Sequence, residues 1–172
     1  MFDTFGEFDS AEEINLAAAE LKAKGDEKKL VALALENGID KEDVADYMND
    51  EMDTLVTPLS AAEAKIKVEA ERLEVGGILI DWKNTILDAC LSDEKMQRAV
   101  RKKGKSLCGC LAMLMKFAFE NKVQVSNEIV KKCRVKHNGK EEPLRGPLYL
   151  GIPSAAQSKK IVTEYYLGVN KK

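Results

Sequence analysis

The stretch Gly104-Lys105-Ser106-Leu107-Cys108-Gly109-Cys110-Leu111 (GKSLCGCL) opens a strongly apolar segment of the 172-residue chain. From residue 107 onward, apolar side chains recur at the three- and four-residue spacing that is typical of one helix face. We predict a helix over residues 107–120 that lies at the centre of the core or at a helix-helix dimer seam. The apolar face comprises Leu107, Cys110, Leu111, Leu114, Phe117 and Ala118, and Cys108, Met115 and Phe119 widen it.

The tripeptide Gly104-Lys105-Ser106 matches the end of a phosphate-binding loop, which also needs a glycine five residues before Gly104. Ala99 stands at that position, and the preceding sequence reads as a helix rather than a strand. Nucleotide hydrolysis is therefore not expected. A weaker interpretation stays open, in which an anion sits at the helix N-terminus beside the lysines of this segment.

A zinc site would combine Cys108, Cys110, Cys133 and His137. In a helix, Cys108 and Cys110 point about 200° apart, so they do not share a tetrahedral ion unless the helix begins later. Core packing is the better explanation for Cys110. His137 is the only histidine, it lies in a polar connection, and no spacing supports a catalytic triad or pair. We expect no metal, no cofactor and no enzymatic activity.

Capping signals and apolar periodicity predict an all-α protein, a helical bundle of about eight short helices. Three short helices form an acidic N-terminal unit over residues 1–57, and residues 58–172 form a helical core domain. The third of these helices is predicted to follow Asp40 through residues 41–52. Residues 135–151 are expected to be an exposed connection with a short hairpin at His137-Asn138-Gly139-Lys140.

The composition is that of a globular protein: 45 % of residues are hydrophobic, and no apolar run approaches the roughly 18 residues that span a bilayer. We expect a cytoplasmic protein with reduced thiols that does not bind membranes. The net charge of −2 is strongly segregated. Residues 1–90 carry 22 acidic and 9 basic residues, whereas residues 91–172 carry 7 acidic and 18 basic residues. Such segregation concerns partners rather than fold.

Six cations lie within the eleven residues 95–105, enough for several contacts to phosphate. A solvated helix end explains them equally well, so both interpretations stay open. No aromatic residue is interleaved, which argues against base stacking. This candidate basic face comprises Lys95, Arg98, Arg101, Lys102, Lys103 and Lys105.

Three carboxylates, Glu42, Asp46 and Asp50, recur every four residues on the predicted third helix. The helical rise places neighbouring carboxylates about 6 Å apart along the axis, close to two base steps of about 3.4 Å along one nucleic-acid strand. This candidate acidic face is either a mimic of a phosphate row or ordinary exposed acid.

Three segments together resemble a known family: GKSLCGCLAMLMKFA, the following SNEIVKKC, and LGIPSAAQSKKIVTEYYLG. They are similar to the PcfK-like family of mobile-element proteins, over residues 95–168. The matching positions are Lys105, Leu107, Gly109 and Cys110, residues 128–130, and Tyr165 with Tyr166. Cys108 stands where the family pattern has lysine or another polar residue, and residues 1–57 lie outside the shared part.

The PcfK-like family includes inhibitors of type II CRISPR nucleases, so the resemblance implies an anti-CRISPR protein. We expect it to bind the effector nuclease with its guide RNA directly, inside the host bacterial cell and without catalysis. The acidic face would meet the basic channel of the effector, and the basic face would contact the partner or its nucleic acid. The alternative is a nucleic-acid-binding accessory protein of a conjugative element or phage. A homodimer through helix 107–120 and a monomer with that helix at its centre explain the apolar face equally well, so both stay open.

Overall fold

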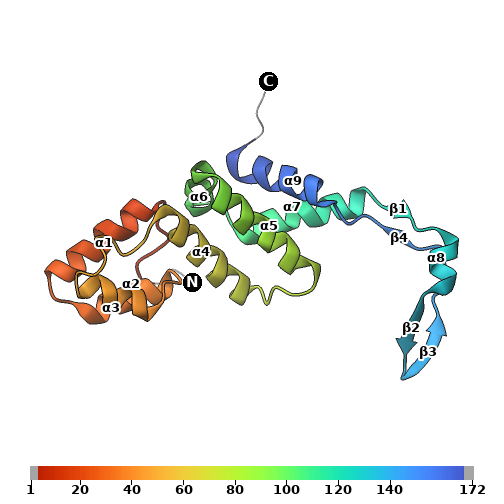
Figure 1. The fold of residues 1–172 in the computed structure, drawn as a ribbon, viewed down its shortest axis with the longest axis horizontal. Coiled ribbons are helices and arrows are strands. Elements are labelled where there is room, and N and C mark those ends of the chain that lie inside the picture. Colours follow the sequence, from red (N-terminus) through yellow and green to blue (C-terminus); the bar gives the residue numbers. More distant parts are fainter. Residues whose placement is uncertain (1–3, 169–172) are drawn as a thin grey trace.

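The computed structural model describes residues 4–168, so residues 1–3 and 169–172 of the two predicted domains lie outside the described part. Within it the chain forms nine helices and two pairs of short strands (Figure 1). The helices are α1 (Ala11–Ala23), α2 (Glu27–Glu36), α3 (Lys41–Met48), α4 (Pro58–Arg72), α5 (Ile78–Ser92), α6 (Glu94–Arg101), α7 (Leu107–Glu120), α8 (Asn127–Lys132) and α9 (Ala155–Leu167). The strands are β1 (Val123–Gln124), β2 (Arg134–His137), β3 (Lys140–Pro143) and β4 (Tyr149–Leu150).

The fold is mainly helical, as predicted, but it is not strictly all-α. The predicted hairpin is confirmed: β2 and β3 pair antiparallel across Asn138 and Gly139. Both turn residues have positive φ, 50° and 78°, as the two-residue turn of a twisted hairpin requires. The pairing of β1 with β4 was not predicted, because each strand has only two residues and the partners lie far apart in sequence.

One cluster of buried apolar side chains joins α1, α2 and α3 to one face of α4. Ser10 and Asp26 begin the first two helices by accepting the backbone N–H of Glu13 (3.2 Å) and Lys29 (3.1 Å). Ile14, Leu30 and Leu33 are fully buried in this cluster. The helix α3 ends at Met48, earlier than predicted.

A second cluster joins the other face of α4 to α5, α6, α7 and α9. The buried apolar residues of α4 divide between the clusters: Ala61 and Ala64 belong to the first, Ala62 and Ile66 to the second. The helix α7 has the predicted bounds and buries Leu107, Cys110, Leu111 and Leu114. The prediction that its apolar face extends further round is wrong, because Cys108, Met115 and Phe119 are exposed.

Residues 121–154 form an arm that projects from the bundle, carrying the paired strands β1 and β4, the helix α8 and the β2–β3 hairpin at its end (Figure 1). The N-terminal helices α1–α3 lie at the opposite end of the molecule. All residues of the hairpin strands are exposed. No helix of residues 4–168 combines the length and apolarity needed to cross a membrane.

The ammonium group of Lys65, on α4, lies where the N-terminal segment meets the α6–α7 connection. Its side chain has no exposed surface. The Nζ atom donates to the Glu7 carboxylate at 2.6 Å and to the carbonyl oxygens of Lys102 and Lys105 at 3.2 and 2.8 Å. A buried ammonium group needs this many acceptors because desolvation penalises an unpaired charge.

Replacing Lys65 with methionine should destabilise the protein by about 3 kcal/mol, because it leaves a partly buried carboxylate and several carbonyl groups without their donor. Lys67 is the matched control, since it lies two positions further along α4 and pairs with Asp40 at 2.8 Å on the surface. Lys67→Met should cost less than about 1 kcal/mol. Urea unfolding measures both values, and equal losses would contradict the assigned role of Lys65.

Candidate functional site

The N-terminus of α7 already binds an anionic group supplied by the protein. The backbone N–H of Leu107 donates to the carboxylate of Glu69, which is almost completely buried on α4. The Ser106 hydroxyl accepts the N–H of Gly109 at 3.1 Å. Burial raises the pKa of the Glu69 carboxyl, and its hydrogen bond from Leu107 opposes that shift. The predicted anion position is therefore occupied by a side chain, as the helix dipole favours.

The residues around Ser106 fasten α7 to the terminal helix α9. Lys105 Nζ donates to the Tyr165 carbonyl oxygen at 2.6 Å and lies 4.9 Å from the centre of the same ring. The Tyr165 hydroxyl accepts the N–H of Ser106 at 3.0 Å. A Cβ atom at Gly109 would collide with that hydroxyl group. In this fold the motif therefore joins α7 to α9.

The two cysteines of the motif have different surroundings. Cys110 is buried and Cys108 is exposed, consistent with side chains that point apart on a helix. Burial raises the pKa of the Cys110 and Cys90 thiols to about 12, so both stay protonated at neutral pH. His137 is exposed at the end of β2. Among residues 4–168, no group of three His, Cys, Asp or Glu side chains is placed to hold a metal ion.

The six cations of the candidate basic face do not form one exposed surface. Arg101 is buried and donates to the side-chain oxygen of Asn37, and burial lowers its pKa to about 10. Arg98 pairs with Glu12 at 2.5 Å and with Glu94 at 2.9 Å.

Lys105, the third of these cations with a structural contact, binds Tyr165, as described above. Lys95, Lys102 and Lys103 remain exposed. Asp9 of the N-terminal segment covers part of this surface by accepting the backbone N–H of Lys103 at 2.8 Å. Only three of the six cations are thus presented to a partner.

The candidate acidic face is shorter than predicted. Glu42 and Asp46 lie on α3, but Asp50 lies beyond its end in a left-handed conformation, with φ of 61°. The Asp50 carboxylate pairs with Lys22 at 2.6 Å. The regular four-residue spacing therefore covers two carboxylates rather than three.

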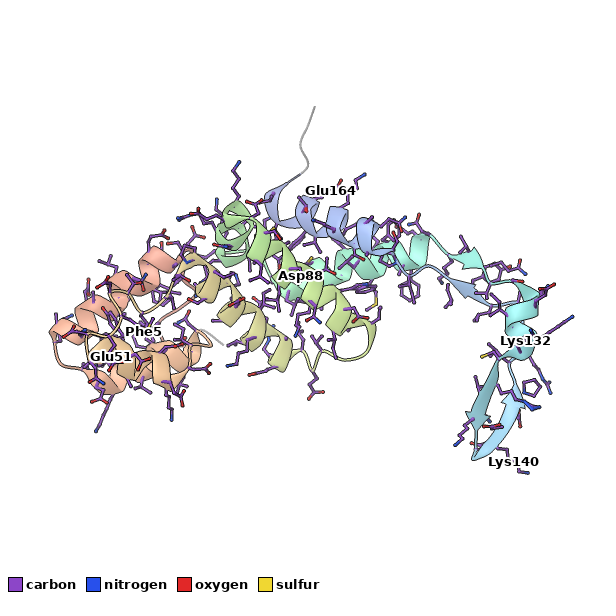
Figure 2. The ribbon with its side chains drawn as sticks, in the orientation of Figure 1. Phe5, Glu51, Asp88, Lys132, Lys140 and Glu164 are labelled. Atoms are coloured by element: carbon purple, nitrogen blue, oxygen red, sulfur yellow. The ribbon has the colours of Figure 1, made fainter. Side chains whose placement is uncertain are left out.

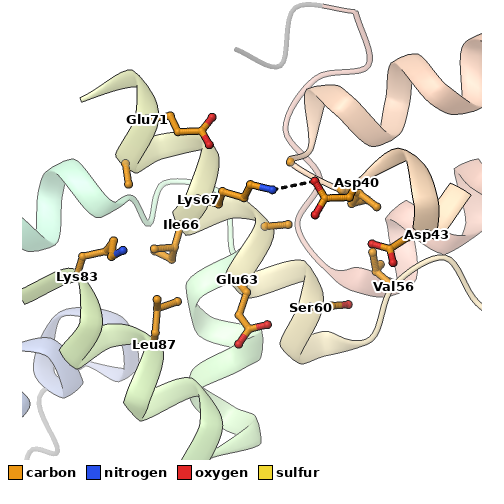
Figure 3. Close-up of a pocket in the computed structure, with 14 residues that line it drawn as sticks. Asp40, Asp43, Val56, Ser60, Glu63, Ile66, Lys67, Glu71, Lys83 and Leu87 are labelled. Atoms are coloured by element: carbon orange, nitrogen blue, oxygen red, sulfur yellow. Dashed lines mark hydrogen bonds and ion pairs between the residues drawn. The ribbon is translucent and has the colours of Figure 1, made fainter. Parts of the chain in front are cut away.

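A groove of about 500 Å³ runs beside α3, between α4 and α5 (Figure 3). Asp40 crosses part of it to bind Lys67. The charged side chains at the groove are four acids and two lysines, so it extends the negative surface of α3 towards α5. These charged residues are Asp40, Asp43, Glu63, Glu71, Lys67 and Lys83.

A second basic surface lies on the arm, in a segment whose sequence contains no motif that predicts it. Figure 2 shows Lys132 and Lys140 on the arm, remote from the bundle. Seven cations of the arm are spaced irregularly along the sequence, so the sequence alone does not group them into one surface. In the fold all seven are exposed. The seven are Lys122, Lys131, Lys132, Arg134, Lys136, Lys140 and Arg145.

Comparison of the chain with protein-family models, curated proteins and solved structures finds no match. The resemblance to the PcfK-like family therefore stays a prediction that depends on the residues quoted for it. Several of those residues, including Lys105, Gly109 and Tyr165, serve the junction between α7 and α9.

Gly109→Ala should destabilise the protein by about 1–3 kcal/mol, because the added methyl group displaces Tyr165 from a packed junction. Alanine is the better helix former, so helix propensity alone predicts the opposite sign. Gly76→Ala is the control, since the nearest atom to its Cβ would lie 3.9 Å away, and it should change stability by less than about 0.5 kcal/mol. Thermal unfolding distinguishes the two, and a stabilised Gly109 variant would refute the junction.

Proposed function

We propose that the protein is an anti-CRISPR that inhibits a type II CRISPR effector nuclease by direct binding. The observation that carries this proposal is the concentration of negative charge on one structural unit. Residues 1–57 contain 16 acidic and 5 basic residues, a net charge of −11. Effector nucleases of this type hold their guide–target duplex in a positively charged channel. A compact acidic unit is electrostatically complementary to such a channel.

The acids of α3 and of the adjoining groove are the proposed contact. Glu42 is exposed, and Asp43 and Asp46 are half-buried on the same short helix. The helix is held through Val44 and Tyr47, which are buried in the first apolar cluster. A rigid support matters because a pre-organised charged surface loses less conformational entropy when it binds.

The N-terminal unit is also fastened to the rest of the molecule by polar contacts. Lys65 binds Glu7, Arg101 binds Asn37, and Arg98 binds Glu12. These contacts orient the acidic surface relative to α4–α6. We propose that the three exposed lysines of the basic face, next to this junction, meet the guide RNA or acidic parts of the effector at the rim of the complex.

The alternative, an accessory protein that binds nucleic acid through residues 95–105, has weaker support. Half of the cations in that segment already serve contacts within the protein. A homodimer through α7 is a separate proposal, supported by the exposed side chains of Met113, Met115 and Phe119. Light scattering of the purified protein tests it.

Excess protein should abolish target cleavage by a susceptible type II effector loaded with guide RNA, and inhibition should weaken as salt rises. The double variant Glu42→Gln with Asp46→Asn should need an about tenfold higher concentration for half inhibition, because charge steers association. The control Asp81→Asn with Asp88→Asn removes the same charge from exposed positions on α5.

The control should inhibit like the unmodified protein. Undiminished cleavage at excess protein, across a panel of type II effectors, would refute the proposed function. Equal weakening by both double variants would refute the assignment to α3.

A further inference from the structure

The arm carries a charged surface that the proposed nuclease contact does not use. Residues 121–154 contain seven lysines and arginines and three glutamates, a net charge of +4. All seven cations are exposed. In the described part of the chain, none of the seven forms an ion pair within 4.0 Å, whereas cations of the bundle such as Arg98 and Lys65 do. The ammonium group of Lys122 lies 4.5 Å from the centre of the Phe119 ring, and the other six cations can meet a partner.

The end of the arm has the shape of a narrow two-stranded ribbon. β2 and β3 pair over four residues each, from Arg134 opposite Pro143 to His137 opposite Lys140. Paired strands lie about 4.8 Å apart, and the major groove of B-form DNA, about 12 Å wide, admits such a ribbon. All residues of the two hairpin strands are exposed.

The register places cations on both faces of the ribbon. Side chains alternate along a strand, so Arg134 and Lys136 share one face and Lys140 lies on the other with His137. A ribbon inside a groove is flanked by phosphates of both DNA strands. Cations on both faces match that environment, whereas binding to a flat anionic surface uses only one face.

We propose that the β2–β3 hairpin binds double-stranded DNA in its major groove, with Arg134, Lys136 and Lys140 contacting phosphates on the two groove walls. Lys131 and Lys132 of α8 then lie at the entrance of the groove. A-form RNA is a poorer partner, because its major groove is too narrow and deep for side chains to reach. This inference does not depend on nuclease inhibition.

The exposed apolar residues of the arm lie mainly outside this ribbon. Val123, Tyr149 and Leu150 belong to the β1–β4 pair at the base of the arm. Val135 is the one large apolar side chain that β2 and β3 expose. The tip thus lacks the apolar area that a membrane or a second copy of the chain would cover, and charge is its main means of binding.

Two glutamates of the ribbon allow a test with opposite signs. Glu141 lies opposite Lys136 and Glu142 lies opposite Val135, both exposed. Near phosphates these carboxylates are repelled, so Glu141→Gln with Glu142→Gln should tighten DNA binding. A damaged fold does not produce tighter binding, which separates the proposed contact from loss of structure.

The experiment measures fluorescence anisotropy of a labelled 20-base-pair DNA duplex with the full-length protein over a series of salt concentrations. The triple variant Arg134→Gln, Lys136→Gln, Lys140→Gln should weaken binding at least about tenfold and reduce the salt slope by up to about 3, one for each lost phosphate contact. The matched control, Lys95→Gln, Lys102→Gln, Lys103→Gln, removes the same charge from the bundle and should bind nearly as the unmodified protein does.

Weaker binding by the hairpin triple together with tighter binding by the glutamine pair supports the proposal. Absence of duplex binding at low salt would overturn it. Equal or greater loss in the bundle control would place the DNA contact on α6 and its following loop, and also overturn it. Preference for single-stranded DNA, for duplex RNA or for anionic vesicles would refute the groove geometry. Circular dichroism melting verifies that each variant is folded.

Discussion

The structure depends on two buried charged groups one helix turn apart on α4, the Lys65 ammonium and the Glu69 carboxylate. Lys65 binds Glu7 of the N-terminal segment and the carbonyl oxygens of the α6–α7 connection, so it holds together parts of the chain that are far apart in sequence. Four residues later on α4, Glu69 accepts the first N–H group of α7. One helix turn thus supplies a cation to a loop and an anion to a helix N-terminus. Both charges are acceptable inside the protein because each has hydrogen-bond partners.

The tripeptide Gly104-Lys105-Ser106 matches the end of a phosphate-binding loop, but in this fold its residues make contacts within the protein. The lysine of GKS binds the end of α9, the serine caps α7, and the glycine three residues further admits Tyr165. The N-terminus of α7 is not free to bind an external anion, because the Glu69 carboxylate already accepts the N–H of Leu107. The charged surfaces on which the two proposals depend lie at opposite ends of the molecule, on the acidic helices α1–α3 and on the basic arm.

The sequence predicted local structure better than it predicted which charges are buried. The bounds of α7 and the Asn138-Gly139 hairpin follow from capping and turn chemistry, which act between near neighbours. Lys65, Glu69 and Arg101 lie among other charged residues and read as exposed, because their partners come from distant segments. For the same reason the sequence predicts a larger basic face than the fold exposes. The cations of the arm follow no periodicity, so the sequence indicates only an exposed connection there. Asp50 does not belong to the acidic face, because α3 ends two residues before it.

The amide proton of Leu107 reports on the contact by which Glu69 fills the N-terminus of α7. Its chemical shift should be followed by nuclear magnetic resonance as pH is varied, in the unmodified protein and in Glu69→Gln. Since burial raises the pKa of Glu69, we expect a transition above the usual range of a glutamate carboxyl, and no such transition in the variant. A Leu107 chemical shift that does not change with pH, or one that titrates identically in both proteins, would contradict the contact between Glu69 and Leu107.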